Sequence, residues 1–239
     1  MNNKRITEAI VLGAFLCLGM IVLGYFISSS IIRIKGLDRT VTVKGLSERE
    51  MPANKAIWPI KFSEADNDLN HLYSAIQQKT DLIIAFLKIN GFDDKEISIL
   101  APAIIDRQAQ GYVDPHKVKF RYTANAIITV YTSKVDSIRE TMKKLVQLGK
   151  KGIAIGGQDY QTRIEYIFTK LNEIKPEMVE EATKKAREVA EKFAKDSNSR
   201  LGKIKRARQG QFSINNRDSN TPYIKKIRVV STLEYYLSD

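Results

Sequence analysis

The sequence has very few of the side chains that usually carry catalysis or bind metals. It contains one cysteine, Cys17, and two histidines, His71 and His116. A single cysteine excludes an intramolecular disulfide, so the cysteine count says nothing about the redox compartment. Neither histidine has a cysteine or a second histidine at a metal-ligand spacing. These absences argue against a histidine-based metal site and against a cysteine nucleophile.

Familiar catalytic motifs are also missing from the sequence. The glycine-rich run at 149–157 lacks the Gly-Lys-Ser/Thr register of a phosphate-binding loop, so it predicts a turn or a bulge. No Gly-x-Ser-x-Gly motif is present to expose a serine nucleophile. Acidic pairs such as Glu48/Glu50 and Glu180/Glu181 fall in predicted turns or on an exposed helix rather than across a cleft. We therefore expect no catalytic residue, no metal and no cofactor.

One long segment carries no charge. Residues 9–32 read AIVLGAFLCLGMIVLGYFISSSII, running from Ala9 through Leu16 and Gly24 to Ile32. About 20 apolar residues are enough to span the hydrocarbon core of a bilayer. The small residues near its end leave cleavage around residues 28–30 open as an alternative. Because the run is longer than the apolar region of a signal peptide, it predicts an uncleaved membrane anchor.

Charges on the two sides of this segment give opposing signals about orientation. Lys4 and Arg5 precede it and favour a cytoplasmic N-terminus, whereas Arg33, Lys35 and Arg39 follow it and favour the reverse. An apolar span followed by one soluble body is the usual signal-anchor layout. We therefore expect the body to lie outside the cytoplasm, on a single-pass protein of the inner membrane.

The chain is strongly basic, with 39 Lys and Arg against 27 Asp and Glu and a formal net charge of +12. Residues 1–39 account for +3 of this, so the rest carries about +9. Such a surface favours anionic partners: phospholipid headgroups, acidic polysaccharide or nucleic acid. The densest run, KIKRARQG, places Lys203, Lys205, Arg206 and Arg208 on a predicted strand. No aromatic residue is interleaved there for base stacking, so we expect no nucleic-acid partner.

Hydrophobic periodicity divides the rest of the chain into strands and helices. The expected order is β-β-α-β-β followed by α-β-α-β-β, which predicts an α+β fold with antiparallel sheets covered by helices on one face. We expect an anchor at 1–39 and a body at 40–239, with subdomains at about 40–132 and 133–239 as an open alternative. Strands are expected at 40–45, 56–64, 96–108, 117–131, 160–168, 202–211 and 223–237, and helices at 66–90, 133–149 and 175–197.

Several local features sharpen these expectations. Residues 46–55 read as a turn, and Pro59 predicts an edge strand or a bulge because proline cannot donate a ladder hydrogen bond. Ser133 is a candidate N-cap, and Pro176 is expected in the first turn of its helix. Trp58 and the Tyr235-Tyr236 pair are expected to pack on sheet faces. The expected apolar stripe of the last helix is Val179, Ala182, Ala186, Val189 and Phe193.

Three stretches together resemble the SIMPL-domain family. RTVTVKGLSEREMPANKAIWPIKF at 39–62 resembles the family's opening Val-Thr-Val-x-Gly strand, proline-containing turn and second strand. EEATKKAREVAEKFAKDSNSRLGKIKRARQG at 180–210 resembles its alanine-rich helix running into Leu-Gly-x-Ile, and IKKIRVVSTLEYYL at 224–237 is similar to its closing strand. The similarity covers about residues 40–237. DRQAQGY and RDSNTPYIKKIRVVSTLEY resemble a membrane-anchored bacterial branch.

The resemblance implies an α+β body in the bacterial envelope, usually facing the periplasm. Relatives include outer-membrane-associated antigens that form ring-like or channel-like homo-oligomers, and others linked to oxidative-stress tolerance. No catalytic residues are established for the family. Three hypotheses follow: a self-assembling membrane-anchored scaffold, a basic tethered binding module for an acidic envelope component such as a lipid headgroup or glycan, and an envelope enzyme of unrecognised type.

Overall fold

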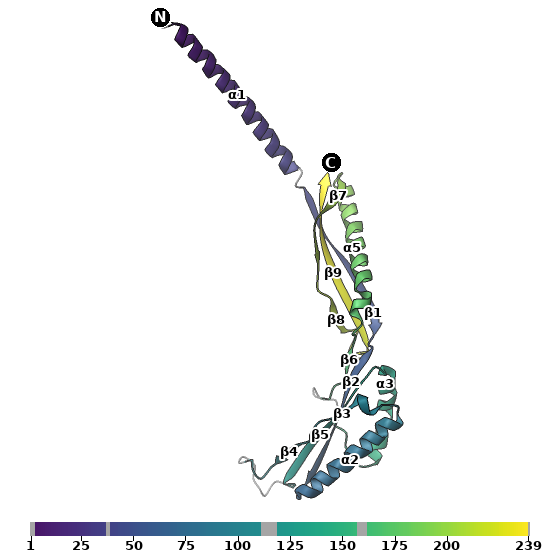
Figure 1. Ribbon diagram of the computed structural model, residues 1–239. Helices are drawn as coiled ribbons and strands as arrows, with labels where there is room; N and C mark the ends of the chain where they lie inside the picture. Colours follow the sequence, from purple (N-terminus) through teal and green to yellow (C-terminus); the bar gives the residue numbers. More distant parts are fainter. Residues whose placement is uncertain (1–2, 37–38, 111–118, 157–161, 239) are drawn as a thin grey trace. The chain divides into compact units, whose positions relative to one another are not determined.

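The computed structural model describes residues 3–36, 39–110, 119–156 and 162–238 (Figure 1). An apolar N-terminal helix precedes antiparallel sheets packed with helices, which confirms the predicted α+β class. The chain forms two compact units. Unit 1 comprises Met1–Glu48, Lys175–Phe212 and Arg228–Asp239, and unit 2 comprises Arg49–Ile174 and Ser213–Ile227. Both units are discontinuous in sequence. The predicted division of the body into subdomains near residue 132 stays a prediction.

Helix α1, Asn3–Gly36, contains the whole uncharged segment, including Ala9, Leu16, Gly24 and Ile32. Within it, Val11–Ser28 has a mean hydropathy of 2.3, and none of that stretch is buried against the rest of the protein. The helix is therefore long and apolar enough to cross a membrane, as an anchor or as a signal sequence.

Unit 2 is built on a five-stranded antiparallel sheet in the order β3-β5-β2-β6, with β4 also paired to β5. A continuous ladder joins β2 to β5, from the Ala56–Thr132 pair to the Asp66–Tyr122 pair. Alternate residues of both strands are buried on one face, as their period-2 pattern predicts. The strands are β2 (Lys55–Asp66), β3 (Ile97–Ile99), β4 (Ala103–Asp106), β5 (Tyr122–Thr132) and β6 (Glu165–Ile167).

Pro59 lies inside this sheet rather than on an edge strand. Strand β2 has β5 on one side and β6 on the other, and its pairing with β5 continues through Pro59 opposite Thr129 without a bulge. The expectation of an edge strand or a bulge is therefore wrong. The proline is tolerated because β6 pairs only with Lys55–Ile57 and stops before reaching it.

Helices cover one face of the unit 2 sheet. They are α2 (Leu69–Ile89), α3 (Val135–Lys143) and α4 (Val146–Lys150), with a 3₁₀ turn η1 (Asp94–Glu96). The Asp68 side chain caps α2 by accepting the backbone N–H groups of Asn70 and His71, and Gly91 follows its end with a φ of 90°. Trp58 packs edge-to-face on Phe92 in the core between these helices and the sheet, as expected for a sheet-face aromatic.

In unit 1, one long helix runs beside the strands of a sheet (Figure 1). Its strands β1 (Thr40–Pro52), β9 (Ile224–Ser238) and β7 (Arg200–Gln209) lie in the order β1-β9-β7, and β1 and β9 also contribute residues to unit 2. Helix α5 (Leu171–Asp196) packs on the sheet through Ala186 and Ala190, which contact Val43, Leu233 and Tyr235. The same sheet has a further strand, β8 (Ser213–Asn216), which pairs with β9 but belongs to unit 2, and which lies between the strands expected at 202–211 and 223–237.

Gly45 sets how closely α5 approaches β1. A Cβ atom at this position would lie 1.8 Å from the carbonyl oxygen of Ala182 and 2.5 Å from the backbone nitrogen of Ala186. Both distances are far below any allowed contact, and both involve helix backbone, so only glycine fits here. The Val-Thr-Val-Lys-Gly stretch therefore ends at the point where strand and helix backbones touch.

The buried face of α5 differs from the predicted stripe. Alanines at every fourth position face inward, whereas Val189 and Phe193 are exposed. Close backbone packing at Gly45 leaves room for methyl groups but not for larger side chains. The helix also begins at Leu171, so Pro176 lies inside it and not in its first turn. The buried residues are Met178, Ala182, Ala186, Ala190 and Ala194.

Other boundaries also differ from expectation. Strand β1 continues to Pro52 through the predicted turn, and the strand expected at 96–108 is two short strands, β3 and β4. Helix α3 has Lys134 as its N-cap instead of Ser133, and the Thr132 hydroxyl accepts the Lys134 backbone N–H. The polar loop at 109–116 and the starts of the strands expected at 117 and 160 fall partly outside the described residues.

Candidate functional site

The described residues contain no group of three or more His, Cys, Asp or Glu side chains placed to hold a metal ion. His71 lies in the first turn of α2 and is exposed, and His116 lies outside the described part of the chain. Glu96 and Lys134 form a polar cluster in which their charged groups are 2.9 Å apart, with Thr132 and Asp93 as further partners. This cluster joins η1 to the start of α3, so it stabilises a chain junction and does not define a cavity.

The predicted basic run lies on β7, whose outer edge has no strand partner among the described residues. Lys203, Lys205, Arg206 and Arg208 are all exposed. Glu234 lies opposite Arg206 in the β7–β9 register and also forms an ion pair with Lys205 at 3.7 Å. The Lys205 ammonium in addition lies 5.4 Å from the centre of the Tyr236 ring. The structure thus brings the four cations together on one strand, and one carboxylate balances part of their charge.

An exposed apolar patch lies on unit 1, between β1 and α5. Leu46, Val189 and Phe193, here called the α5 patch, expose 38%, 36% and 55% of their surfaces. Val189 and Phe193 are one helical turn apart and so lie on the same side of α5. Leu46 and Val189 line one hollow of about 400 Å³. Charges of both signs surround that hollow: Lys44, Glu48, Lys185, Glu188 and Lys192.

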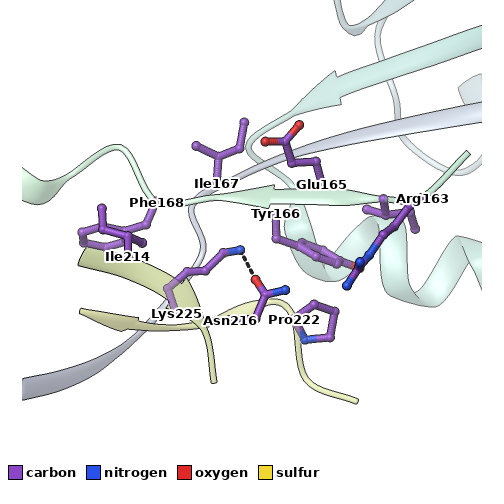
Figure 2. Close-up of a pocket in the computed structure, with 10 residues that line it drawn as sticks. Arg163, Glu165, Tyr166, Ile167, Phe168, Ile214, Asn216, Pro222 and Lys225 are labelled. Carbon is purple, nitrogen blue, oxygen red and sulfur yellow. Dashed lines mark hydrogen bonds between the residues drawn. The ribbon is translucent and has the colours of Figure 1, made fainter. Parts of the chain in front are cut away.

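A larger pocket, of about 690 Å³, lies within unit 2 between β6 and the hairpin formed by β8 and β9. We call it the hairpin pocket. Figure 2 shows Tyr166 and Phe168 directed to the side that carries Lys225 and Asn216, while Glu165 and Ile167 point away. Alternation along β6 produces this separation, because successive side chains point to opposite faces. Ile214, Pro222 and Arg163 complete much of the lining.

Lys225 is the unusual residue of this pocket. Its surface is only 8% exposed, and its ammonium donates a hydrogen bond to the side-chain oxygen of Asn216. Burial lowers the pKa of Lys225, and the nearby positive charge of Arg163 acts in the same direction, whereas Glu165 opposes them. No carboxylate in the described residues lies within ion-pair distance of Lys225. The pocket therefore holds a desolvated positive charge whose partner is a neutral amide.

The aromatic wall of the pocket is fixed in place by neighbouring rings. Tyr166 contacts Tyr223 edge-to-face, with ring centres 6.1 Å apart. The Arg139 guanidinium lies 3.8 Å from the centre of the Tyr223 ring. Burial raises the pKa of the Tyr166 hydroxyl, which therefore stays neutral at physiological pH. The wall can offer an apolar surface and a neutral hydrogen-bonding group to a ligand.

Sequence reasoning did not identify Lys225 or its pocket. One signal was present: Lys225 shares strand parity with Ile227, Val229 and Leu233, which all face inward. A lysine at an inward position of an alternating strand indicates a buried charge. The residues that meet it come from β6 and β8, and their placement depends on the fold.

Comparison with known proteins identifies the family of the chain. The family model described as "SIMPL: Protein of unknown function (DUF541)" matches residues 41–230. The chain therefore belongs to the SIMPL family, and the resemblance expected from the opening strands, the alanine-rich helix and the closing strand is confirmed. A search of curated proteins gave no match.

Proposed function

We propose that this protein is a non-catalytic, membrane-anchored scaffold of the bacterial envelope that self-associates through the α5 patch. The observation that carries the proposal is the exposure of Val189 and Phe193 on α5, whose inward face is made mainly of alanines, together with the exposure of Leu46 on the neighbouring strand β1. Large apolar side chains on the outside of a helix, with small ones inside, are placed for an external partner.

The surroundings of the patch favour a second copy of the chain as that partner. Its rim carries Lys44, Lys185 and Lys192 together with Glu48 and Glu188. An apolar centre with a charged rim is the usual anatomy of a protein interface. Because both signs are present, two copies related by a two-fold axis can place lysines opposite glutamates. A purely basic or acidic rim would repel its own copy.

The free edge of β7 is a weaker candidate for self-association. Four cations line it, and its pairing with β9 is interrupted between Leu201 and Ile204 and again between Ile204 and Arg206. Charged residues and irregularities of this kind protect edge strands from pairing with other chains. We therefore assign self-association to the helix face and not to the strand edge.

Location forms a second part of the proposal. The length of the apolar stretch in α1 and the charges before it support an uncleaved anchor in the inner membrane, with the body in the periplasm. Protease added to spheroplasts should then degrade the body, while an intact inner membrane protects a cytoplasmic marker. Protection of the body would reverse the orientation.

The test of self-association is the mass of the full chain in mild detergent, measured by light scattering on a sizing column. We expect a discrete multimer, and we expect Val189→Glu and Phe193→Glu to lower its mass. Val146→Glu is the matched control, because Val146 is an exposed valine, at 68%, on a unit 2 helix. A monomeric wild-type chain overturns the proposal. A multimer that survives both patch variants excludes this surface as the interface.

Measuring residues 40–239 in the same way separates the two sources of assembly. A multimer that is retained without α1 places the interface in the body. A multimer that is lost with α1 makes the membrane helix the organiser, for which Gly24 and Ser28 offer a small-residue contact.

A basic binding module is the second candidate function, and the cations of β7 favour it. The described residues supply no ion-pair partner for Lys203 or Arg208, so these two are available to an acidic lipid headgroup or glycan. Flotation with vesicles that contain anionic lipid should then weaken steeply as salt rises, and Lys203→Gln with Arg208→Gln should weaken it further. Flotation that is independent of salt removes this candidate.

The family resemblance also suggests a role in oxidative-stress tolerance, which we include as the physiological part of the proposal. Cells that lack the protein should survive peroxide less well than cells that express it. Equal survival would leave the scaffold without this role.

A further inference from the structure

We infer that the hairpin pocket of unit 2 binds a small amphipathic carboxylate, with its acidic group at Lys225 and its apolar body against Tyr166 and Phe168. This site is separate from the α5 patch, so the inference does not depend on self-association.

The charge of Lys225 is the first argument for an anionic ligand. Removing an ammonium group from water is costly unless an opposite charge compensates it. Here the ammonium bonds to the neutral side chain of Asn216, and Glu165 points to the other side of β6 (Figure 2). Arg163, which also lines the pocket, adds a second positive charge. An incoming carboxylate would supply the missing negative charge.

The size and lining of the pocket are the second argument. A volume of about 690 Å³ falls within the roughly 300–1,000 Å³ typical of sites for small organic molecules. An inorganic anion would leave most of this space unused. Tyr166, Phe168, Ile214 and Pro222 offer apolar surface beside the charged group. A molecule with one acidic end and an apolar body matches both parts of the lining.

The rigidity of the wall is the third argument. Tyr166 is held by Tyr223, which is itself covered by Arg139. A wall that is fixed before binding loses little conformational entropy when a ligand arrives. Asn216 is exposed while its partner Lys225 is buried, and both line the same pocket. A ligand carboxylate can therefore reach Lys225 by replacing or joining Asn216.

The probe is 4-phenylbutyrate, titrated by calorimetry into the full chain in lipid nanodiscs, with empty nanodiscs subtracted. Its neutral analogue 4-phenylbutyramide has the same apolar body and no charge. We expect the carboxylate to bind at least tenfold more tightly than the amide. Lys225→Met should abolish this preference, while amide binding stays within twofold. Arg163→Gln should reduce carboxylate affinity by about threefold, as expected for an exposed cation beside the site.

Lys226→Met is the matched control, because Lys226 neighbours Lys225 and does not line the pocket. It should leave both affinities unchanged. Equal binding of carboxylate and amide, no measurable carboxylate binding, or an equal loss in both lysine variants overturns the inference. Far-UV circular dichroism of each variant checks that it is folded. If Lys225→Met does not fold, Arg163→Gln and the carboxylate-to-amide ratio of the wild type still decide the question.

Discussion

Units 1 and 2 use the same ingredients, an antiparallel sheet and helices, but they build their cores differently. Unit 2 buries large side chains such as Trp58, Phe62 and Phe92 between its sheet and its helices. Unit 1 buries a small cluster in which alanines of α5 face Val43, Leu233 and Tyr235. Burial of large apolar surface stabilises the first unit, whereas close approach of backbones organises the second. The two units should therefore respond to different kinds of mutation.

Deleting a large core side chain should damage unit 2 most. We expect Phe62→Ala to lower the free energy of unfolding by about 3–5 kcal/mol, because Phe62 is fully buried and its loss leaves a cavity. Fluorescence of Trp58, the only tryptophan, reports this transition during denaturant unfolding in mild detergent. Leu233→Ala in unit 1 is the matched deletion and should cost less. Equal costs would break the contrast between the two cores.

Adding a single methyl group should damage unit 1 instead. We expect Gly45→Ala to lower the free energy of unfolding by at least about 2 kcal/mol, because the new Cβ would meet the backbone of α5 at Ala182. Hydrogen exchange of β1 and β9 peptides should show earlier opening there. Gly149→Ala in α4 is the control: a Cβ there meets nothing within 4 Å, and alanine favours a helix. Protection in β1 that Gly45→Ala leaves unchanged would contradict the close-contact account of unit 1.

Low pH should lower the free energy of unfolding of unit 2, because Glu96 becomes protonated. Burial opposes its ionisation, but hydrogen bonds from Thr132, the Asp93 backbone and Lys134 outweigh burial and hold the pKa of Glu96 below its ordinary value of 4.5. The unfolded chain therefore takes up this proton at a higher pH than the folded protein does. The stabilisation is complete above about pH 4.5 and is lost as the pH falls through the lowered folded pKa.

Glu96→Gln keeps the shape of the side chain and removes its charge. We expect it to lower the free energy of unfolding by about 1 kcal/mol at neutral pH. Below pH 4.5 the stability of the variant should depend less on pH than that of the wild type. The Trp58 transition, followed at several pH values, measures both effects. A variant that loses stability in acid as steeply as the wild type would show that other carboxyl groups control this region.

The smallest expected effect is a gain of stability in unit 1. The Ser231 hydroxyl oxygen is buried and has no hydrogen-bond partner among the described residues. Ser231→Ala removes this unsatisfied group, so we expect the variant to gain up to about 1 kcal/mol. Slower hydrogen exchange of β9 peptides would show the gain. A loss of stability would mean that the hydroxyl has a partner in solution.

The sequence predicted the unit 2 core better than the unit 1 core, and the reason is physical. Strands β2 and β5 alternate large apolar and polar residues, so the period of the pattern specifies their inward faces directly. In α5, Val189 and Phe193 are more hydrophobic than the alanines beside them, but the inward face was selected by size, at a contact with Gly45 that lies far away in the sequence. Periodicity weighs hydrophobicity and cannot anticipate such a steric limit.

The candidate sites likewise divide into those that sequence could predict and those that only the fold assembles. The apolar segment of α1 and the four cations of β7 were found from sequence, because each is a contiguous run. The hairpin pocket was not found, because Lys225, Tyr166 and Asn216 come from three strands that only the fold brings together. The α5 patch was missed because Val189 and Phe193 were assigned to the buried stripe of the helix and Leu46 to a turn.

The pairing of β1 with β9 also sets an order of events during synthesis. The Leu237 backbone N–H donates to the carbonyl of Arg39, so two residues separated by almost 200 positions close the sheet of unit 1. At roughly 5–20 residues per second, β1 waits about 10–40 s for its partner strand to be made. The β2–β5 ladder of unit 2 can form well before then. The first strand after α1 is therefore among the last to fold, and chaperones have their longest opportunity to bind there.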